Sequence, residues 1–139
     1  MNEFNLKDKV AVVTGGTGLI CSEMARALAF QGVKTAILGR KRETAENVAE
    51  SITRETGVTS IGIPANVLDR NSLQEAKKEI NSRLGAINIL INGAGGNSPE
   101  ATTKVEKMTG EEGEKPEDTF FGLQTEGFDK VFDLNFKGT

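Results

Sequence analysis

Four short apolar runs alternate with amphipathic segments between residues 10 and 92, and this alternation limits the folds open to the chain. The apolar runs fall at 10–13, 35–38, 60–65 and 87–92. Strands that alternate with helices form a parallel sheet, because right-handed crossovers place the helices on both of its faces. We therefore expect a doubly wound parallel α/β sheet of about four strands.

Three helices are expected between these strands, at residues 20–30, at 43–56, and from Asp69 or Asn71 to Leu84. A glycine follows each helix, where a left-handed residue can close the last turn. These glycines are Gly32, Gly57 and Gly85. Pro64 cannot donate a ladder hydrogen bond, so it predicts that the third strand lies at or near a sheet edge. A further helical pattern begins at Phe128.

The first apolar run leads through a glycine-rich turn into a helix, in the stretch "VAVVTGGTGLICSEMARAL" at residues 10–28. Gly15 permits a tight turn, and Gly16 and Gly18 let the backbone approach a phosphate without an intervening Cβ. The first amides of the helix would then face the pyrophosphate of a dinucleotide, helped by the helix dipole. The cofactor contacts expected here are Gly15, Gly16, Thr17, Gly18, Leu19 and Ile20. A glycine corner that binds no ligand is the alternative.

Composition excludes several other kinds of site. The 139 residues carry a net charge of −3 and contain one Cys but no His, Tyr or Trp. This charge offers no electrostatic basis for binding nucleic acid or an anionic membrane. A catalytic triad based on His cannot form, and we expect no metal site. The polar start "MNEFNLKD" and the lack of a long apolar run predict a soluble, cytoplasmic protein with no membrane partner.

Three motifs, in the same order along the chain, resemble those of the short-chain dehydrogenases/reductases. "TGGTGLIC" at 14–21 is similar to the cofactor loop TGxxGxxG of that family, with Cys21 in place of the last glycine. "NGAG" at 92–95 is similar to the NNAG motif, with Gly93 in place of the second Asn. "DLNFKGT" at 133–139 resembles the helix that carries the family's catalytic Asn. Together with "ILGRKRETAENVAE", these stretches look closest to the D-mannonate oxidoreductase (fructuronate reductase) branch.

The resemblance implies a Rossmann-type fold, a bound NAD or NADP, and a role for several further residues. Asn66 and Val67 correspond to the pair that contacts adenine, although Asn66 could instead simply end its strand. The residues expected against the adenine ribose are Asn92, Gly93, Ala94 and Gly95. Asn135 is the expected catalytic Asn, which supports a water-linked proton path. Cys21 is interpreted as a packing residue.

The second strand ends in "LGRKR", and this ending bears on the choice of dinucleotide. An acidic residue there would bind the ribose hydroxyls of NAD, but Gly39 and Arg40 occupy the position. A guanidinium can bind a 2′-phosphate with two hydrogen bonds, so these residues favour NADP. The D-mannonate oxidoreductase branch, which the sequence resembles, is associated with NAD instead. A third possibility is that Arg40 is only solvated and contacts no cofactor. The choice between NAD and NADP therefore stays open.

The reaction implied by the resemblance interconverts a sugar-acid ketone and its secondary alcohol, such as D-fructuronate and D-mannonate. Its acid/base chemistry needs a Tyr and a Lys a few residues later, and the chain contains no Tyr. We therefore expect residues 1–139 to be an incomplete dinucleotide-binding domain without the C-terminal catalytic part, inactive by itself. A non-catalytic dinucleotide-binding module is the main alternative, and a methyltransferase-like site is less supported because the acidic residue after the second strand is missing.

Two further expectations concern the rest of the chain. Residues 96–127 form a long polar loop, which is either a lid over the substrate or a solvated segment. The fourth strand would lack a neighbour on one side, and an exposed apolar edge favours pairing with another chain. We therefore expect self-association or a homo-oligomer, disorder near that edge, or a missing C-terminal half supplied elsewhere. The expected substrate is a small sugar acid.

Overall fold

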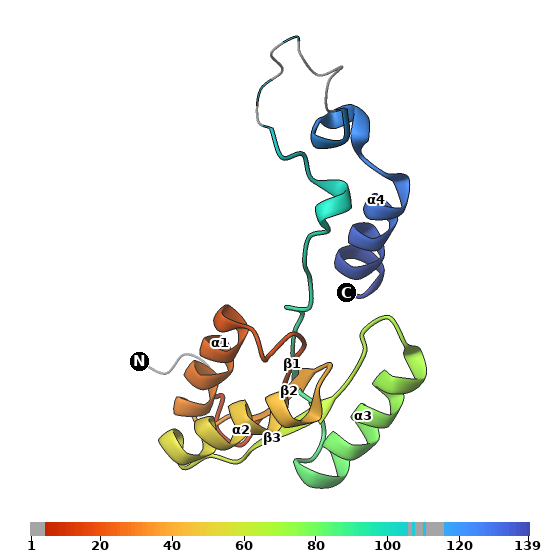
Figure 1. The fold of residues 1–139 in the computed structure, drawn as a ribbon. Helices are drawn as coiled ribbons and strands as arrows, with labels where there is room; N and C mark the ends of the chain where they lie inside the picture. The colour runs from red at the N-terminus through yellow and green to blue at the C-terminus, as the bar shows by residue number, and fades with distance from the viewer. Residues whose placement is uncertain (1–4, 106, 108–109, 111–115) are drawn as a thin grey trace. The chain divides into compact units, whose positions relative to one another are not determined.

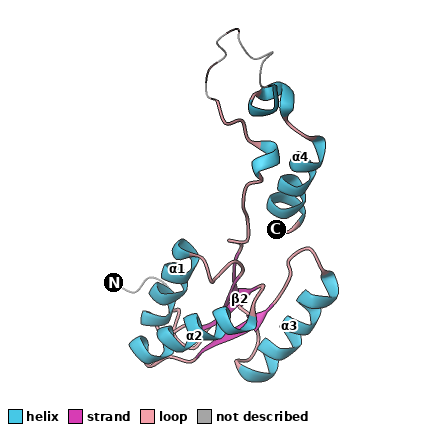
Figure 2. Ribbon diagram, in the orientation of Figure 1, coloured by secondary structure: helices cyan, strands magenta, loops and turns pink. Residues whose placement is uncertain are grey.

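The structure is a computed structural model that describes residues 5–105, 107, 110 and 116–139. The chain divides into two compact units, Met1–Ala94 and Gly95–Thr139, which we describe one at a time. Figure 1 follows the chain through both units, and Figure 2 separates helices from strands. That residues 1–139 work as one cofactor domain stays a prediction.

The first unit contains a four-stranded parallel sheet in the order β3-β2-β1-β4. Its strands are β1 (Val10–Val13), β2 (Lys34–Gly39), β3 (Ser60–Pro64) and β4 (Ile89–Ile91). In the middle of the sheet, Val12 pairs with Ala36 on one side and with Leu90 on the other. The predicted doubly wound Rossmann-type sheet of four strands is confirmed. β3 lies at an edge, as Pro64 predicted.

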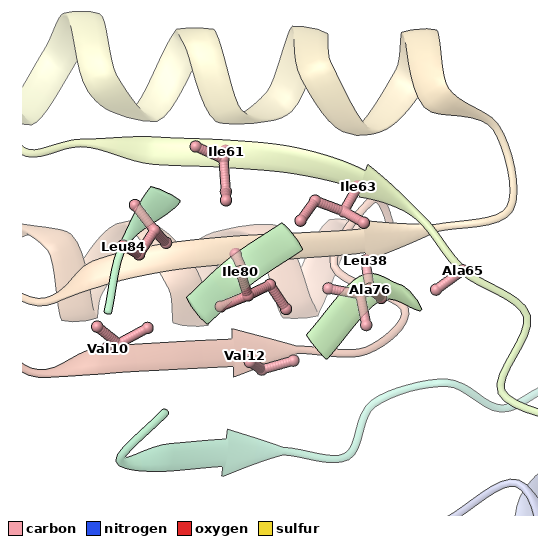
Figure 3. Packing of buried hydrophobic residues seen from close by; sticks show 10 residues of the cluster. Val10, Val12, Leu38, Ile61, Ile63, Ala65, Ala76, Ile80 and Leu84 are labelled. Atoms are coloured by element: carbon pink, nitrogen blue, oxygen red, sulfur yellow. The ribbon is translucent and has the colours of Figure 1, made fainter. Parts of the chain in front are cut away.

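Helices cover both faces of this sheet. They are α1 (Leu19–Phe30), α2 (Arg42–Thr56) and α3 (Arg70–Arg83). Figure 3 shows the side chains of Val12, Leu38 and Ile63 beside those of Ala76 and Ile80 from α3. A second buried cluster holds Val13 and Ile37 of the strands with apolar residues of the other two helices, namely Ala25 and Ala29 of α1 and Ala49 and Ile52 of α2. β1 is apolar throughout because both of its faces are covered.

The ends of the helices follow the predicted signals. Gly57 closes α2 in the left-handed conformation, with φ of 72°. Of the two candidate N-caps for α3, the structure selects Asp69, whose carboxylate accepts hydrogen bonds from the amides of Asn71 and Ser72. The two hydrogen bonds of Asp69 satisfy backbone amides that the helix itself leaves unpaired.

The fourth strand is shorter than predicted, spanning Ile89–Ile91 rather than residues 87–92. The side-chain oxygen of Asn88 accepts a hydrogen bond of 2.9 Å from the amide of Val10, while the backbone amide of Asn88 donates to the Val10 carbonyl at 2.9 Å. The strand is also less covered than its sequence suggests, because Leu90 is 58% exposed.

The second unit consists of short turns and one helix. Single 3-10 turns lie at Pro99–Ala101, Pro116–Asp118 and Phe120–Gly122. Helix α4 (Thr125–Phe132) begins three residues before the predicted Phe128 and continues into a π-helical turn at Asp133–Lys137. The predicted loop at 96–127 therefore holds local structure, whereas its positions 106, 108–109 and 111–115 lie outside the described residues. No helix in the described part of the chain is long and apolar enough to cross a membrane.

Candidate functional site

The glycine turn leaves β1 sharply and runs against the neighbouring strand. Gly15 has φ of 62°, and its carbonyl accepts a hydrogen bond of 2.9 Å from the amide of Gly18. The amide of Gly16 donates to the carbonyl of Leu38 at 3.0 Å, which holds the turn against the end of β2. A Cβ on Gly16 would lie 2.9 Å from both the Ile37 side chain and the Val13 carbonyl. At Gly16 the turn is thus bare backbone because its surroundings leave no room for a side chain.

The N-terminus of α1 is open at this corner. Its N-cap is Gly18, no side chain caps it, and no acidic residue stands in the first turn. Leu19 and Ile20 are 83% and 71% exposed, so the first two residues of the helix do not pack into the protein. The first amides of a helix have no acceptor within it, and the helix dipole makes them attractive to an anion. An anionic linker can therefore approach these amides.

Thr14 joins the turn to the loop that follows β4. Its hydroxyl oxygen accepts hydrogen bonds from the amides of Gly93 at 3.0 Å and Ala94 at 3.1 Å, while its own amide donates to the carbonyl of Ile91. The side chain is buried, so it acts as an internal brace. The sequence reasoning missed Thr14, although its place between a strand and the first glycine of the turn could have pointed to it.

The turn and the loop also meet through their backbones. A Cβ on Gly15 would lie 2.5 Å from the carbonyl oxygen of Gly93 and 2.9 Å from the nitrogen of Ala94. Two segments that lie far apart in the sequence, the turn at 15–18 and the loop at 92–94, are therefore in contact. The carboxyl ends of β1 and β4 bring them together, as neighbouring parallel strands do.

The end of β2 contributes a small residue and then cations. A Cβ on Gly39 would lie 2.6 Å from the methyl carbon of Thr17, so the turn packs directly on this strand end. Arg40 and Lys41 follow and are exposed, and neither joins an ion pair among the residues that the structure describes. Arg42, one step further on, pairs with Glu46 at 3.3 Å.

Asn66 and Val67 follow β3 and so lie at the same carboxyl edge of the sheet. The amide oxygen of Asn66 accepts a hydrogen bond of 3.1 Å from the amide of Leu68, and the backbone amide of Asn66 donates to the hydroxyl of Ser72. Asn66 therefore forms a local turn at the end of its strand while its side chain stays exposed. An amide oxygen has two acceptor positions, so the local hydrogen bond leaves one for a ligand.

Asn135 belongs to the second unit and organises its first residues. Its side-chain nitrogen donates to the carbonyls of Gly96 at 2.7 Å and Val131 at 2.8 Å, while its oxygen accepts from the amide of Gly96 at 3.1 Å. A Cβ on Gly95 would lie 2.6 Å from that oxygen. Asn135 thus holds the glycine segment at 95–96 against the π-helical turn that contains it. Nearby in the same turn, the hydrogen bond and charge of Asp133 raise the pKa of Lys137.

Cys21 is half-buried and free, and it packs against the cluster that contains Val13 and Ala25. Its sulfur lies 3.8 Å from the carbonyl oxygen of Gly93. Within the described part of the chain, no cluster of three or more His, Cys, Asp and Glu side chains could hold a metal ion. The groups that gather at the carboxyl edge of the sheet include backbone amides, small residues and two cations that pair with none of the described residues.

The strand order and the glycine turn after β1 define a Rossmann-type α/β protein. The short chain dehydrogenase family matches residues 9–139, and the chain belongs to that family. An uncharacterized oxidoreductase of Bacillus subtilis, UxuB, is 48% identical over 134 residues, which make up 96% of this chain and 47% of the relative. The chain therefore spans about half the length of this relative.

Two solved structures are similar to this chain in fold and in sequence. A Haemophilus influenzae protein, provisionally described as a D-mannonate oxidoreductase and solved with bound NAD, is 36% identical and superposes with a TM-score of 0.86. The match covers 96% of this chain and 47% of that one. An NAD⁺-bound xylitol dehydrogenase is 25% identical, with a TM-score of 0.76 and coverage of 97% and 45%.

Proposed function

We propose that the first unit binds NAD(H) or NADP(H) across the carboxyl edge of its sheet, as part of an oxidoreductase. The observation that carries this proposal is the bare corner at residues 15–18, which opens the uncapped N-terminus of α1 to an anion. The pyrophosphate would lie against residues 15–18, next to Thr17, and accept hydrogen bonds from the first amides of α1, beginning at Leu19 and Ile20. Two family members with the same fold were solved with NAD, which supports this assignment.

The adenosine end of the dinucleotide would lie over the ends of β2 and β3. Because the Thr17 methyl group would lie 2.6 Å from a Cβ on Gly39, an acidic side chain there would overlap with Thr17 unless that side chain moved. Arg40 is exposed and unpaired among the described residues, so it can reach a 2′-phosphate. These residues favour NADP(H), whereas the NAD in the Haemophilus protein favours NAD(H). Asn66 and Val67 would contact adenine, and Asn92, Gly93, Ala94 and Gly95 the adjoining ribose.

The substrate we propose is a sugar acid whose ketone and secondary alcohol are interconverted, such as D-fructuronate and D-mannonate. The support is the likeness to the Haemophilus protein over almost the whole of this chain. When bound, the dinucleotide supplies the hydride. Asn135 would act as the catalytic Asn that supports proton transfer. The 139 residues contain no Tyr, so the family's acid/base group is not among them, and we expect no turnover by this chain alone.

That missing Tyr also favours a second candidate, a dinucleotide-binding module without catalysis. The two candidates differ in what a sugar acid does to the bound cofactor. In an oxidoreductase that contains the complete family fold around these residues, D-mannonate with NAD(P)⁺ would produce NAD(P)H. In a binding module, absorbance at the nicotinamide band would stay constant under the same conditions.

Fluorescence titration of the chain with NADH and with NADPH tests the cofactor site. We expect Arg40→Asp to weaken NADPH binding by about tenfold or more, because a charge-assisted hydrogen bond is replaced by repulsion, and to leave NADH nearly unchanged. Lys78→Asp makes the same charge change on the exposed side of α3 and serves as the control. If the folded chain binds neither dinucleotide, the proposed function is wrong. If Arg40→Asp matches Lys78→Asp, the assignment of Arg40 to the 2′-phosphate is wrong.

A further inference from the structure

The two residues at which this chain departs from the family's glycine and NNAG motifs meet in space. Cys21 stands where the cofactor loop of the family has its last glycine, and Gly93 stands where the NNAG motif has its second Asn. A Cβ built on Gly93 would lie 2.1 Å from the sulfur of Cys21. No side chain larger than hydrogen fits at position 93 while the thiol stays in place.

The thiol lies between the buried core and the loop after β4. Cys21 lies in the first turns of α1 and packs against the buried cluster of Val13, Ala25 and Ile37. On its other side the sulfur faces the carbonyl oxygen of Gly93 at 3.8 Å. Movement in one direction would therefore open a gap in the core, and movement in the other would push the loop away from the turn.

Gly93 is held from three sides. Its amide donates to the hydroxyl of Thr14, its carbonyl oxygen lies where a Cβ on Gly15 would fall, and Cys21 occupies the space beside its own Cα. Its φ is not positive, so the backbone conformation by itself does not require glycine. The space taken by the sulfur of Cys21 is therefore a principal reason for glycine at this position, together with the Thr14 carbonyl at 2.9 Å.

We propose that Cys21 and Gly93 are a matched pair of positioning residues for the dinucleotide site. The sulfur sets the distance between the first turn of α1, whose amides are proposed to bind the pyrophosphate, and the loop at 92–94, proposed to contact the ribose. This inference rests on the proposed function and adds a structural determinant to it. Its consequence is that the two positions are energetically coupled, so the effect of a side chain at 93 depends on the residue at 21.

A double-mutant cycle on the 139-residue chain tests the pair, using Gly93→Ala, Cys21→Ala and the double variant. Alanine at 21 removes the sulfur without placing a glycine in the helix, where it would lower stability for another reason. Gly96→Ala is the matched control, because a Cβ there would make only an ordinary contact of 3.7 Å with Leu134 and meets no positive φ. Each variant is measured by its thermal midpoint and by its affinity for NADH and NADPH.

We expect Gly93→Ala to lower the thermal midpoint by about 5 °C or more and to weaken dinucleotide binding by about tenfold or more. Cys21→Ala alone should change the affinity by less than about threefold. In the Cys21→Ala background, adding Gly93→Ala should lower the thermal midpoint and the dinucleotide affinity by less than half as much as it does in the unmodified chain. The rescue is partial because the carbonyl of Thr14 would still lie 2.9 Å from the new Cβ. Should Gly93→Ala fail to fold, recovery of a folded double variant provides the same test.

Equal losses from Gly93→Ala in both backgrounds would overturn the inference, as would a Gly93→Ala variant that behaves like Gly96→Ala. The thermal measurements need no ligand, so they keep this test separate from the proposed function. Coupled thermal midpoints in a chain that binds neither dinucleotide would support the pair and contradict the cofactor site. Tight dinucleotide binding with additive effects of the two substitutions on the thermal midpoint would support the cofactor site and contradict the pair.

Discussion

Gly15 carries two independent constraints, and together they account for the shape of the turn. Its φ of 62° lies in the region that side chains disfavour, and a Cβ would lie 2.5 Å from the carbonyl of Gly93. The first constraint acts on the backbone of one residue, whereas the second acts on the contact between the turn and the loop after β4. The first constraint can be predicted from sequence alone, because a glycine just after a strand predicts a tight turn. The second requires the fold.

Gly15→Ala should therefore lower the free energy of unfolding by more than about 2 kcal/mol, since strain and steric overlap add. Gly57→Ala is the matched control: Gly57 has φ of 72°, but a Cβ there would meet nothing within 4 Å. Gly57→Ala should lower the free energy of unfolding by about 1 kcal/mol, from backbone strain alone. Urea denaturation measures both. Equal losses would mean that the turn is not packed against Gly93.

Asn135 provides a second test at the level of single residues. Replacement by Ala removes both hydrogen bonds to Gly96, and we expect hydrogen exchange at the Gly96 amide to accelerate by about tenfold. Asn135→Asp keeps the acceptor for that amide and should accelerate it less. Asn81→Ala, at an exposed position of α3, is the control. Unchanged exchange at Gly96 in Asn135→Ala would show that the contact does not form in solution.

Among the secondary-structure elements, those bounded by strong local signals were predicted best. β1 has the predicted bounds, and α2 ends where Gly57 predicted, because strand pattern and left-handed glycine both act locally. β4 was predicted too long at both ends, and at its start the side chain of Asn88 takes the amide of Val10, a contact between residues 78 positions apart. The contact of Cys21 with Gly93 escaped prediction for the same reason: each departure from the family motif was visible, but their meeting was not.

The N-cap of α3 gives a prediction at this scale, because sequence left Asp69 and Asn71 as alternatives. Asp69 accepts two backbone hydrogen bonds, of 2.9 and 3.4 Å, whereas Asn71 lies inside the helix. Asp69→Ala should lower the free energy of unfolding by about 1 kcal/mol. Asn71→Ala should change it by less than about 0.5 kcal/mol, as expected of an exposed helical position. Thermal or urea unfolding distinguishes them, and a larger effect at Asn71 would contradict the assigned cap.

For the molecule as a whole, the sheet ends at β4 on one side. In the described residues no strand pairs with the outer edge of β4, although its inner edge pairs with β1 in the middle of the apolar core. Leu90 of this strand is 58% exposed. An unpaired strand with an exposed apolar side chain is a template for another chain, which supports the expected self-association.

Sedimentation velocity over a range of concentrations measures that association. We expect the 139-residue chain to form larger species as its concentration rises, and Leu90→Lys to reduce them by placing a charge on the edge strand. Leu68→Lys is the matched control, since Leu68 is 52% exposed but lies outside the strands. A chain that stays monomeric at all concentrations would contradict the prediction.

Backbone amide shifts during a dinucleotide titration test the central claim most directly. In the ¹⁵N-labelled chain, saturation with NADH or NADPH should shift the amides of residues 15–20 most, followed by those of residues 92–94, because the pyrophosphate would lie against the turn and bind the first amides of α1. Binding that leaves residues 15–20 unshifted, with the largest changes elsewhere, would contradict the proposed site.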